Sequence, residues 1–227
     1  MKMKRSEKLG MFTGLVVGVL LLLISVFMIF QTTCKVWGAE KPANATQQGI
    51  DVSSHQGKID WEQVKNSALA DYAIIRCGYG VNQTDKDDKY WDYNSSECER
   101  LGIPYGTYLY SGADTTAKAK SEAEHVVRLL QGKNLTYPIY YDMEADMLNQ
   151  LSSTQIGNIA KTFLNTMESY GYKNVAVYSN KYLFETKLTA SVFSDYPKWI
   201  AQHSNKCTYQ GSYHMWQYST QGVIPGI

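Results

Sequence analysis

The chain has 227 residues, of which 44% are hydrophobic and 13% aromatic, and its 22 basic and 21 acidic residues give a net charge of +1. This composition excludes a disordered chain and is sufficient for one domain of about 180 residues with a sizeable core. The balanced charge argues against nucleic acid as a partner.

Residues 1–39 are expected to form an N-terminal signal or membrane-anchor segment. Four basic groups and one acid precede residue 9, and residues 9–34 carry no charge. That stretch is long enough to cross a bilayer as a helix. The basic flank would stay in the cytoplasm, so the rest of the chain would lie outside. Cleavage after export and retention as an anchor through residues 9–34 are both open.

A polar linker is expected at residues 40–48, before a folded domain at residues 49–227. Cys77 and Cys98 could form a disulfide if the strand and helix that carry them lie together, and Cys207 would then be the odd thiol. No metal site is expected, because no cysteines show metal-ligand spacing and the four histidines are scattered, at His55, His125, His203 and His214.

Predicted strands and helices alternate along the folded domain. Strands are expected at residues 49–53, 72–77, 103–110, 138–141, 174–178, 198–202 and 214–218. Helices are expected after Asp60, which would act as N-cap, and at residues 91–101, 115–130 and 154–170. Little or no helix is expected between the last two strands. Repeated alternation of this kind indicates a parallel sheet covered by helices.

Acidic residues lie where two distant strands end. Asp51 belongs to the first strand, and Asp142 and Glu144 follow the strand at residues 138–141. A barrel collects functional residues at the carboxyl ends of its strands. A nucleotide-binding open sheet would instead need a glycine-rich loop after the first strand, and SSHQG is not such a loop. A barrel with all three carboxylates at one mouth is therefore expected.

The spacing of Asp142 and Glu144 points both side chains the same way, with alpha carbons about 7 Å apart. The plain interpretation is a pair of solvated acids at a strand end. The aromatic and β-branched residues before them favour a position at the rim of a core. Crowding there raises one pKa, so that a protonated carboxyl group stands beside an ionised one, as glycoside hydrolysis requires.

Seven blocks resemble, in order, the glycoside hydrolase family 25 lysozymes, the Chalaropsis-type N-acetylmuramidases: GIDVSSHQGKIDW, YAIIRCGYG, ERLGIPYGTYLYS, PIYYDMEAD, VAVYSN, KWIAQ and MWQYSTQGVIPGI. The resemblance covers residues 49–227. It implies an irregular TIM-like (β/α)5(β)3 barrel of the α/β class. It also implies an exported monomer that needs no cofactor and hydrolyses the β-1,4 bond between N-acetylmuramic acid and N-acetylglucosamine in the glycan strands of peptidoglycan.

The resemblance also assigns site residues. Glu144 matches the catalytic acid of the family, and Asp51 and Asp142 match its other carboxylates. Either a carboxylate attacks the anomeric carbon or activates water, or the 2-acetamido group of the sugar assists while Asp142 orients it, which the spacing favours. The residues at the positions that line the groove of the family are Tyr108, Tyr110, Tyr178, Trp199, Gln217 and Tyr218. Trp216 is expected in the core, and His55 either contacts substrate or lies on the surface.

The chain departs from the family at its end. Relatives continue with a Gly-Asn-Val-Asp-like segment that forms an eighth strand and brings another aspartate to the mouth, whereas this sequence stops at Ile227. We therefore expect either a clipped sequence or a barrel that lacks its last strand. Two competing functions follow: a catalytically impaired peptidoglycan-binding module, and a glycosidase that acts on chitin or another acetamido-sugar polymer.

Overall fold

The computed structural model describes residue 42 and residues 44–227. The predicted leader at residues 1–39, with its apolar stretch at residues 9–34, lies outside the described residues. Within the described part, no helix combines the length and the apolar character that a bilayer crossing requires.

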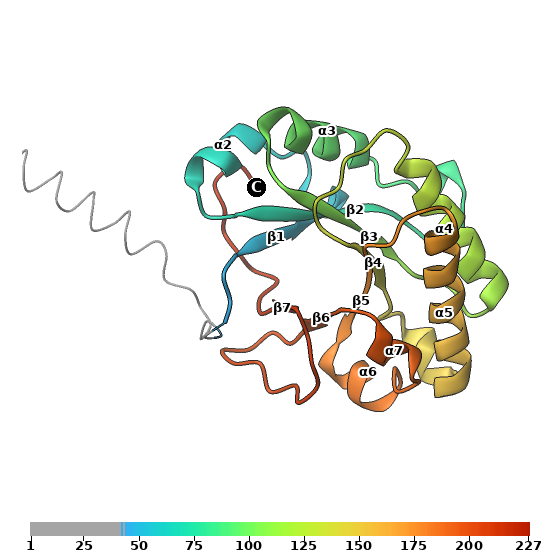
Figure 1. Ribbon diagram of the computed structural model, residues 1–227. Coiled ribbons are helices and arrows are strands. Elements are labelled where there is room, and N and C mark those ends of the chain that lie inside the picture. The colour runs from blue at the N-terminus through green and yellow to red at the C-terminus, as the bar shows by residue number, and fades with distance from the viewer. Residues whose placement is uncertain (1–41, 43) are drawn as a thin grey trace, which may run out of the picture. The chain divides into compact units, whose positions relative to one another are not determined.

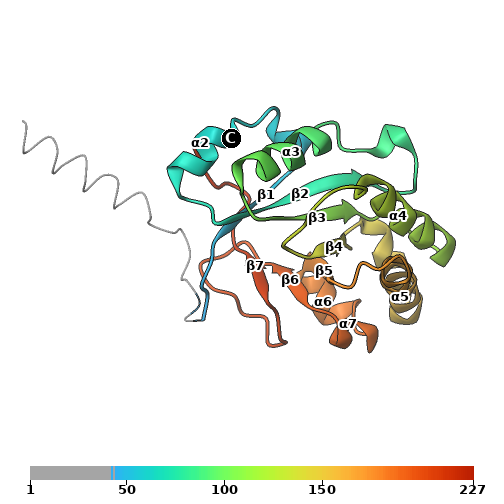
Figure 2. The ribbon, with the colours of Figure 1, turned by 45° about the horizontal axis from the view of Figure 1, so that its top comes forward.

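Seven parallel strands form one sheet in sequence order. They are β1 (Gly49–Val52), β2 (Tyr72–Tyr79), β3 (Tyr105–Tyr110), β4 (Ile139–Asp142), β5 (Val175–Asn180), β6 (Lys198–Ala201) and β7 (Met215–Gln217). The sheet curls into an open barrel, with β1 and β7 as its edges (Figures 1 and 2). The predicted α/β barrel and its seven strands are confirmed.

Helices cover the outside of the curled sheet (Figure 1). The α-helices are α2 (Trp61–Ser67), α3 (Trp91–Leu101), α4 (Thr116–Leu129), α5 (Ser153–Ser169), α6 (Lys181–Thr186) and α7 (Val192–Asp195), and short 3-10 helices are η1 (Ser54–Gln56), η2 (Thr84–Lys86) and η3 (Asp146–Gln150). Asp60 caps α2 as expected, accepting from the Gln63 amide. Thr115, predicted as the first residue of its helix, is instead the N-cap of α4 and accepts from the Lys118 amide. The short helices α6 and α7 were not predicted.

Apolar side chains form one layer on each face of the sheet, because successive residues of a strand point to opposite faces. The outer layer packs under the helices and includes Ile75, Leu109 and Val177. The inner layer fills the barrel, where the indole of Trp199 meets the rings of Tyr140 and Tyr178 edge to face, at centroid distances of 5.0 and 4.5 Å. These rings form an apolar floor beneath the strand ends.

A buried carboxylate ties α4 to the sheet. Glu122 is 0% exposed and accepts hydrogen bonds from Ser111 Oγ at 2.9 Å, the Gly112 amide at 2.7 Å and Tyr141 OH at 2.6 Å. Burial raises the pKa of Glu122, and the three donors oppose that shift. The carboxylate thereby connects the helix to the segment after β3 and to β4.

The cysteines form no disulfide among the described residues. Cys77 on β2 and Cys98 on α3 are both buried free thiols, so the disulfide considered for them is absent from this structure. Cys77 Sγ instead donates to the Tyr108 carbonyl at 3.3 Å, and burial raises the pKa of Cys77 to about 12. Both side chains are part of the outer apolar layer, while Cys207 is half-buried.

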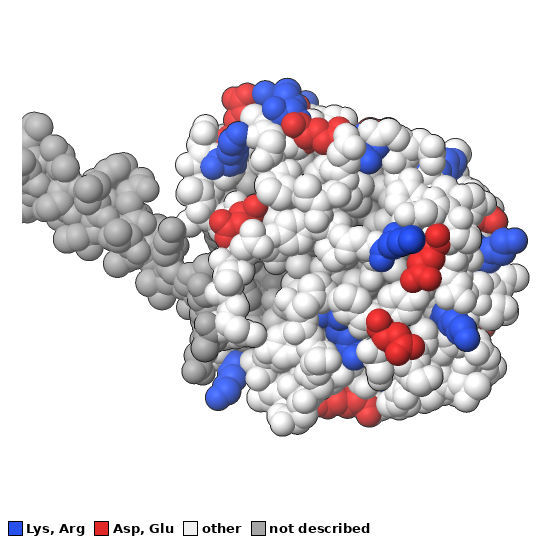
Figure 3. Space-filling view, in the orientation of Figure 1, with Lys and Arg blue, Asp and Glu red and all other residues white. Residues whose placement is uncertain are grey.

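Charged side chains of both signs are interspersed on the face shown in Figure 3. Ion pairs between residues four positions apart in the sequence include Lys118 with Asp114 at 2.8 Å and Lys181 with Glu185 at 2.9 Å. Exposed pairs of this kind contribute little to stability. The two apolar layers are therefore the main source of stability in this fold.

Candidate active site

The structure brings the three predicted carboxylates to one end of the barrel. Asp51 is the third residue of β1, Asp142 is the last residue of β4, and Glu144 follows two residues later. In the sheet, Asp142 stands between Tyr110 of β3 and Tyr178 of β5. The acids interact electrostatically, since Asp51 affects the pKa values of both others.

Burial dominates the ionisation of this cluster. It raises the pKa of Asp142 well above its ordinary value; the charges of Glu144 and Asp51 raise it further, while Arg76 lowers it. Burial also raises the pKa of Glu144, with His203 opposing and Asp51 adding to the shift. Each of the three acids thus retains a proton to higher pH than an isolated carboxyl group would.

Asp142 has an unused acceptor. Its side chain is 3% exposed, and Oδ1 has no hydrogen-bond partner among the described residues. The backbone around it is held on both sides, because the Ser111 amide donates to the Asp142 carbonyl and the Met143 amide donates to the Tyr178 carbonyl, each at 2.9 Å. A fixed, buried oxygen without a donor is suited to receive an N–H or O–H group of a ligand.

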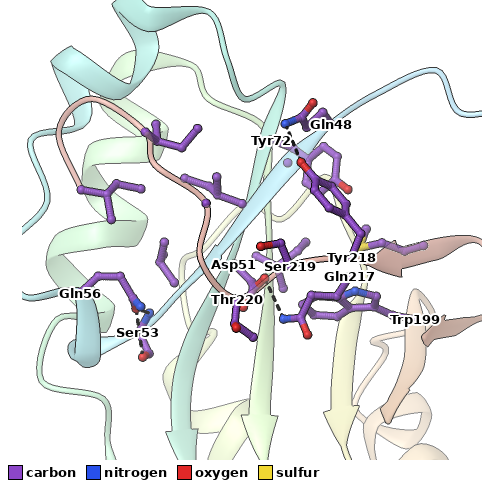
Figure 4. A pocket seen from close by; sticks show the side chains of 18 of the residues that line it. Gln48, Asp51, Ser53, Gln56, Tyr72, Trp199, Gln217, Tyr218, Ser219 and Thr220 are labelled. Atoms are coloured by element: carbon purple, nitrogen blue, oxygen red, sulfur yellow. Dashed lines mark hydrogen bonds between the residues drawn. The ribbon is translucent and has the colours of Figure 1, made fainter. Parts of the chain in front are cut away.

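Asp51 is oriented from β7. Gln217 Nε2 donates to Asp51 Oδ2 at 3.0 Å, as the dashed line in Figure 4 shows. The amide oxygen of Gln217 accepts from Tyr178 OH at 2.9 Å and lies 2.9 Å from His203 Nε2. The Gln217 hydrogen bond lowers the pKa of Asp51, although burial, the larger effect, raises it.

An arginine and an aspartate hold the loop beside the carboxylates. Arg76 of β2 donates through Nε to Asp88 Oδ2 and through a terminal nitrogen to Ser54 Oγ, both at 2.8 Å. Asp88 Oδ2 also accepts from the Ser54 amide at 2.8 Å. Neither Arg76 nor Asp88 was singled out from the sequence. The available signal was one arginine inside the otherwise apolar strand YAIIRC.

A cavity of about 330 Å³ opens beside Asp51, between β1, β7 and the C-terminal segment (Figure 4). Of the predicted groove residues, four line it: Tyr108, Trp199, Gln217 and Tyr218. Trp216 also lines it and is half-buried, so its assignment to the core was wrong; its indole N–H donates to the Gln202 carbonyl at 2.9 Å. His55 is exposed and contributes to the wall.

The other two predicted groove residues lie at the carboxylates rather than on the cavity wall. The pKa of Tyr110 is raised by burial and then by Asp142 and Glu144, and that of Tyr178 is raised by burial and then by Glu144.

Within the described part of the chain, no group of histidine, cysteine or acidic side chains is arranged to hold a metal ion.

Comparisons with known proteins agree on one family. Residues 50–227 match the model of the glycosyl hydrolases family 25. The chain is 29% identical over 181 residues to the autolytic lysozyme of Clostridium acetobutylicum. The matched region covers 79% of this chain and 52% of that protein.

Solved structures have the same fold. The modular autolysin LytC from Streptococcus pneumoniae superimposes with a TM-score of 0.72 and 33% identity, over 79% of this chain and 44% of LytC. LytC has also been solved in complex with a synthetic peptidoglycan ligand. A family 25 glycosyl hydrolase from Bacillus anthracis gives a TM-score of 0.71 at 21% identity, over 83% of this chain and 86% of that one. The chain thus spans about half the length of the autolytic lysozyme and less than half of LytC.

Proposed function

Because the chain belongs to family 25 of the glycosyl hydrolases, we propose that it is a muramidase that cleaves the β-1,4 bond between N-acetylmuramic acid and N-acetylglucosamine in peptidoglycan. The observation that carries this proposal is the meeting of three interacting carboxylates, all with raised pKa values, at one barrel mouth. Glycosidases need one carboxyl group that keeps its proton and a second that stays ionised. The peptidoglycan ligand of LytC supports the choice of substrate.

Glu144 is proposed as the general acid. Its side chain is half-buried, so burial raises its pKa while the group remains accessible to a glycan at the mouth. Asp51 raises the pKa of Glu144 further. Glu144 would therefore keep its proton to higher pH than a free carboxyl group and deliver it to the leaving glycosidic oxygen.

Asp142 is proposed to orient the 2-acetamido group of the sugar. Its free Oδ1 would accept the acetamido N–H and turn the acetamido oxygen toward the anomeric carbon. That oxygen bonds to the carbon as the glycosidic bond breaks and Glu144 protonates the leaving oxygen. Water then opens the resulting ring, with Glu144 taking back a proton. Asp51, held by Gln217, would stabilise positive charge at the anomeric carbon. A sugar ester trapped on Asp51 or Asp142 would instead favour attack by a carboxylate.

The proposed substrate-binding residues fall into two groups. Tyr110 and Tyr178 flank the carboxylates, and the aromatic rings on the cavity wall offer flat apolar surfaces for sugar rings.

We also propose that residues 1–39 export the protein, that residues 40–48 act as a linker, and that residues 49–227 are the catalytic domain. The protein would then act outside the cytoplasmic membrane, where peptidoglycan lies.

Glu144→Gln tests the proposal with purified cell walls. We expect the loss of turbidity to slow by about 10²–10⁴-fold, the usual contribution of a general acid. Asp146→Asn is the matched control, because Asp146 is an exposed acid two residues further along. It should keep activity within about twofold of the wild type.

Product analysis separates the alternatives. New reducing ends on N-acetylmuramic acid support the muramidase. New ends on N-acetylglucosamine, or cleavage of chitin in preference to cell walls, would show a glycosidase of different specificity. Wild-type protein that binds walls and never cleaves them would show a binding module.

A further inference from the structure

His203 in the loop between β6 and β7 contacts the carboxylate cluster through Gln217. Its Nε2 lies 2.9 Å from the amide oxygen of Gln217, which also accepts from Tyr178 OH at 2.9 Å. An amide oxygen can only accept hydrogen bonds, so Nε2 of His203 carries a proton in this arrangement. Histidine and tyrosine thus both donate to the same oxygen.

These contacts determine which way the Gln217 amide points. In the observed orientation the nitrogen of Gln217 donates to Asp51 Oδ2 at 3.0 Å. Turning the amide over would place its oxygen against the carboxylate of Asp51, where two acceptors meet without a proton. His203 therefore helps to keep a donor directed at Asp51.

The His203 side chain also interacts electrostatically with two of the acids, Asp51 and Glu144. The groups that interact with it are Asp51 of β1, Glu144 after β4 and Gln217 of β7, and Tyr178 of β5 shares the Gln217 oxygen with it. Burial raises the pKa of both acids, and the positive charge that His203 can carry opposes that shift in each. His203, which is exposed, thus interacts both with Asp51, proposed to stabilise positive charge, and with Glu144, the proposed general acid.

We propose that His203 is a positioning residue of the active site, which holds the Gln217 amide so that it donates to Asp51. This inference rests on the proposed function for its consequence in catalysis. Its structural part, the effect on Asp51, does not depend on turnover.

The expected consequence is a change in the acidic side of the pH profile. A protonated His203 favours the ionised form of Asp51, so its removal lets Asp51 take up a proton at higher pH.

Two substitutions separate the hydrogen bond from the charge. His203→Gln keeps an N–H donor and removes the charge: the ratio of activity at pH 5 to activity at pH 7 should fall about threefold, with kcat at the optimum nearly unchanged. His203→Ala removes both, so kcat at the optimum should also fall about tenfold, the equivalent of one hydrogen bond. KM should change less than twofold, because His203 acts through Gln217.

Lys206→Gln is the control, since it removes an exposed cation from the same loop. It should reproduce the wild-type profile. Wild-type pH dependence in both His203 variants, or a rise in KM without a change in kcat, would overturn the proposal. Thermal melting of each variant shows whether it is folded.

An NMR titration of the Asp51 carboxyl carbon tests the inference without any turnover. In His203→Ala the midpoint should move to higher pH than in the wild type, and an unchanged midpoint refutes the role of His203. If the wild type cleaves no peptidoglycan, the proposed function fails, and this titration still decides whether His203 acts on Asp51.

Discussion

Replacing Asp142 by asparagine should stabilise the protein at neutral pH while it stops turnover. The carboxylate is 3% exposed, one of its oxygens has no partner among the described residues, and burial raises its pKa well above the ordinary value. Glu144 and Asp51 add like charge nearby, and only Arg76 opposes them. An ionised Asp142 therefore costs folding free energy that an isosteric neutral side chain would not.

The expected gain is modest. Asparagine relieves the buried charge, but it gives up the attraction to Arg76, and its oxygen stays without a donor. Relief of an active-site constraint commonly contributes about 0.5–2 kcal/mol. For a domain of this size each kcal/mol raises the melting temperature by about 2–4 °C, so an increase of about 1–8 °C is expected.

The gain must depend on pH in a definite direction. The folded state holds the Asp142 proton more tightly than the unfolded chain, whose carboxyl groups titrate near 3.8. The wild type therefore loses stability as the pH rises from that value through the raised pKa of the folded state. The variant does not titrate there, so its advantage should be near zero at pH 4 and should grow as the pH rises toward neutral.

Urea unfolding of both proteins at pH 4 and pH 7.5 measures this difference. An equal advantage at both pH values would show that the charge is not the cause. A variant less stable than the wild type at pH 7.5 would refute the reasoning altogether. Asp146→Asn, an exposed acid in the same segment, should change neither value.

The opposite sign is expected for Glu122→Gln, because Glu122 has three donors where Asp142 Oδ1 has none. An amide cannot accept all three hydrogen bonds, so the free energy of unfolding should fall by about 2–3 kcal/mol in urea titrations, and an unchanged value would contradict this. Among the described cysteines, only Cys207 should react with iodoacetamide in the native protein, as read by peptide mass mapping, because Cys77 and Cys98 are buried thiols. Rapid labelling of either buried cysteine would show that the outer layer opens.

Local sequence signals predicted the elements that have clear ends. The helix expected at residues 91–101 has those bounds, because it begins at an apolar Trp91 and ends before Gly102, which adopts a left-handed conformation. Helix α6 was missed since it has only six residues, too few for a helical period to show. Its N-cap, Asn180, is also the last residue of β5, so strand and helix signals overlap there.

The site was predictable only where its residues lie at strand ends. Asp51, Asp142 and Glu144 could be found because parallel strands direct their carboxyl ends to one side. The roles of Arg76 and His203 depend on which strands and loops become neighbours, and no local pattern records that. Their contacts with Asp88 and Gln217 join residues 12 and 14 positions apart in the chain.

Asp51 connects the site to the closure of the barrel. In the described part of the chain β1 and β7 are the edges of the sheet. Gln217 of β7 donates to Asp51 of β1 at 3.0 Å, and Gln48, just before β1, donates to Tyr218 OH, just after β7, at 3.2 Å (Figure 4). The first is charge-assisted when Asp51 is ionised, and such bonds are about twice as strong as neutral ones. Protonation of Asp51 therefore weakens the bridge between the edges at the same pH at which it removes the carboxylate from the proposed chemistry. The ionisation of Asp51 that the proposed reaction requires therefore also strengthens a side-chain hydrogen bond between β7 and β1.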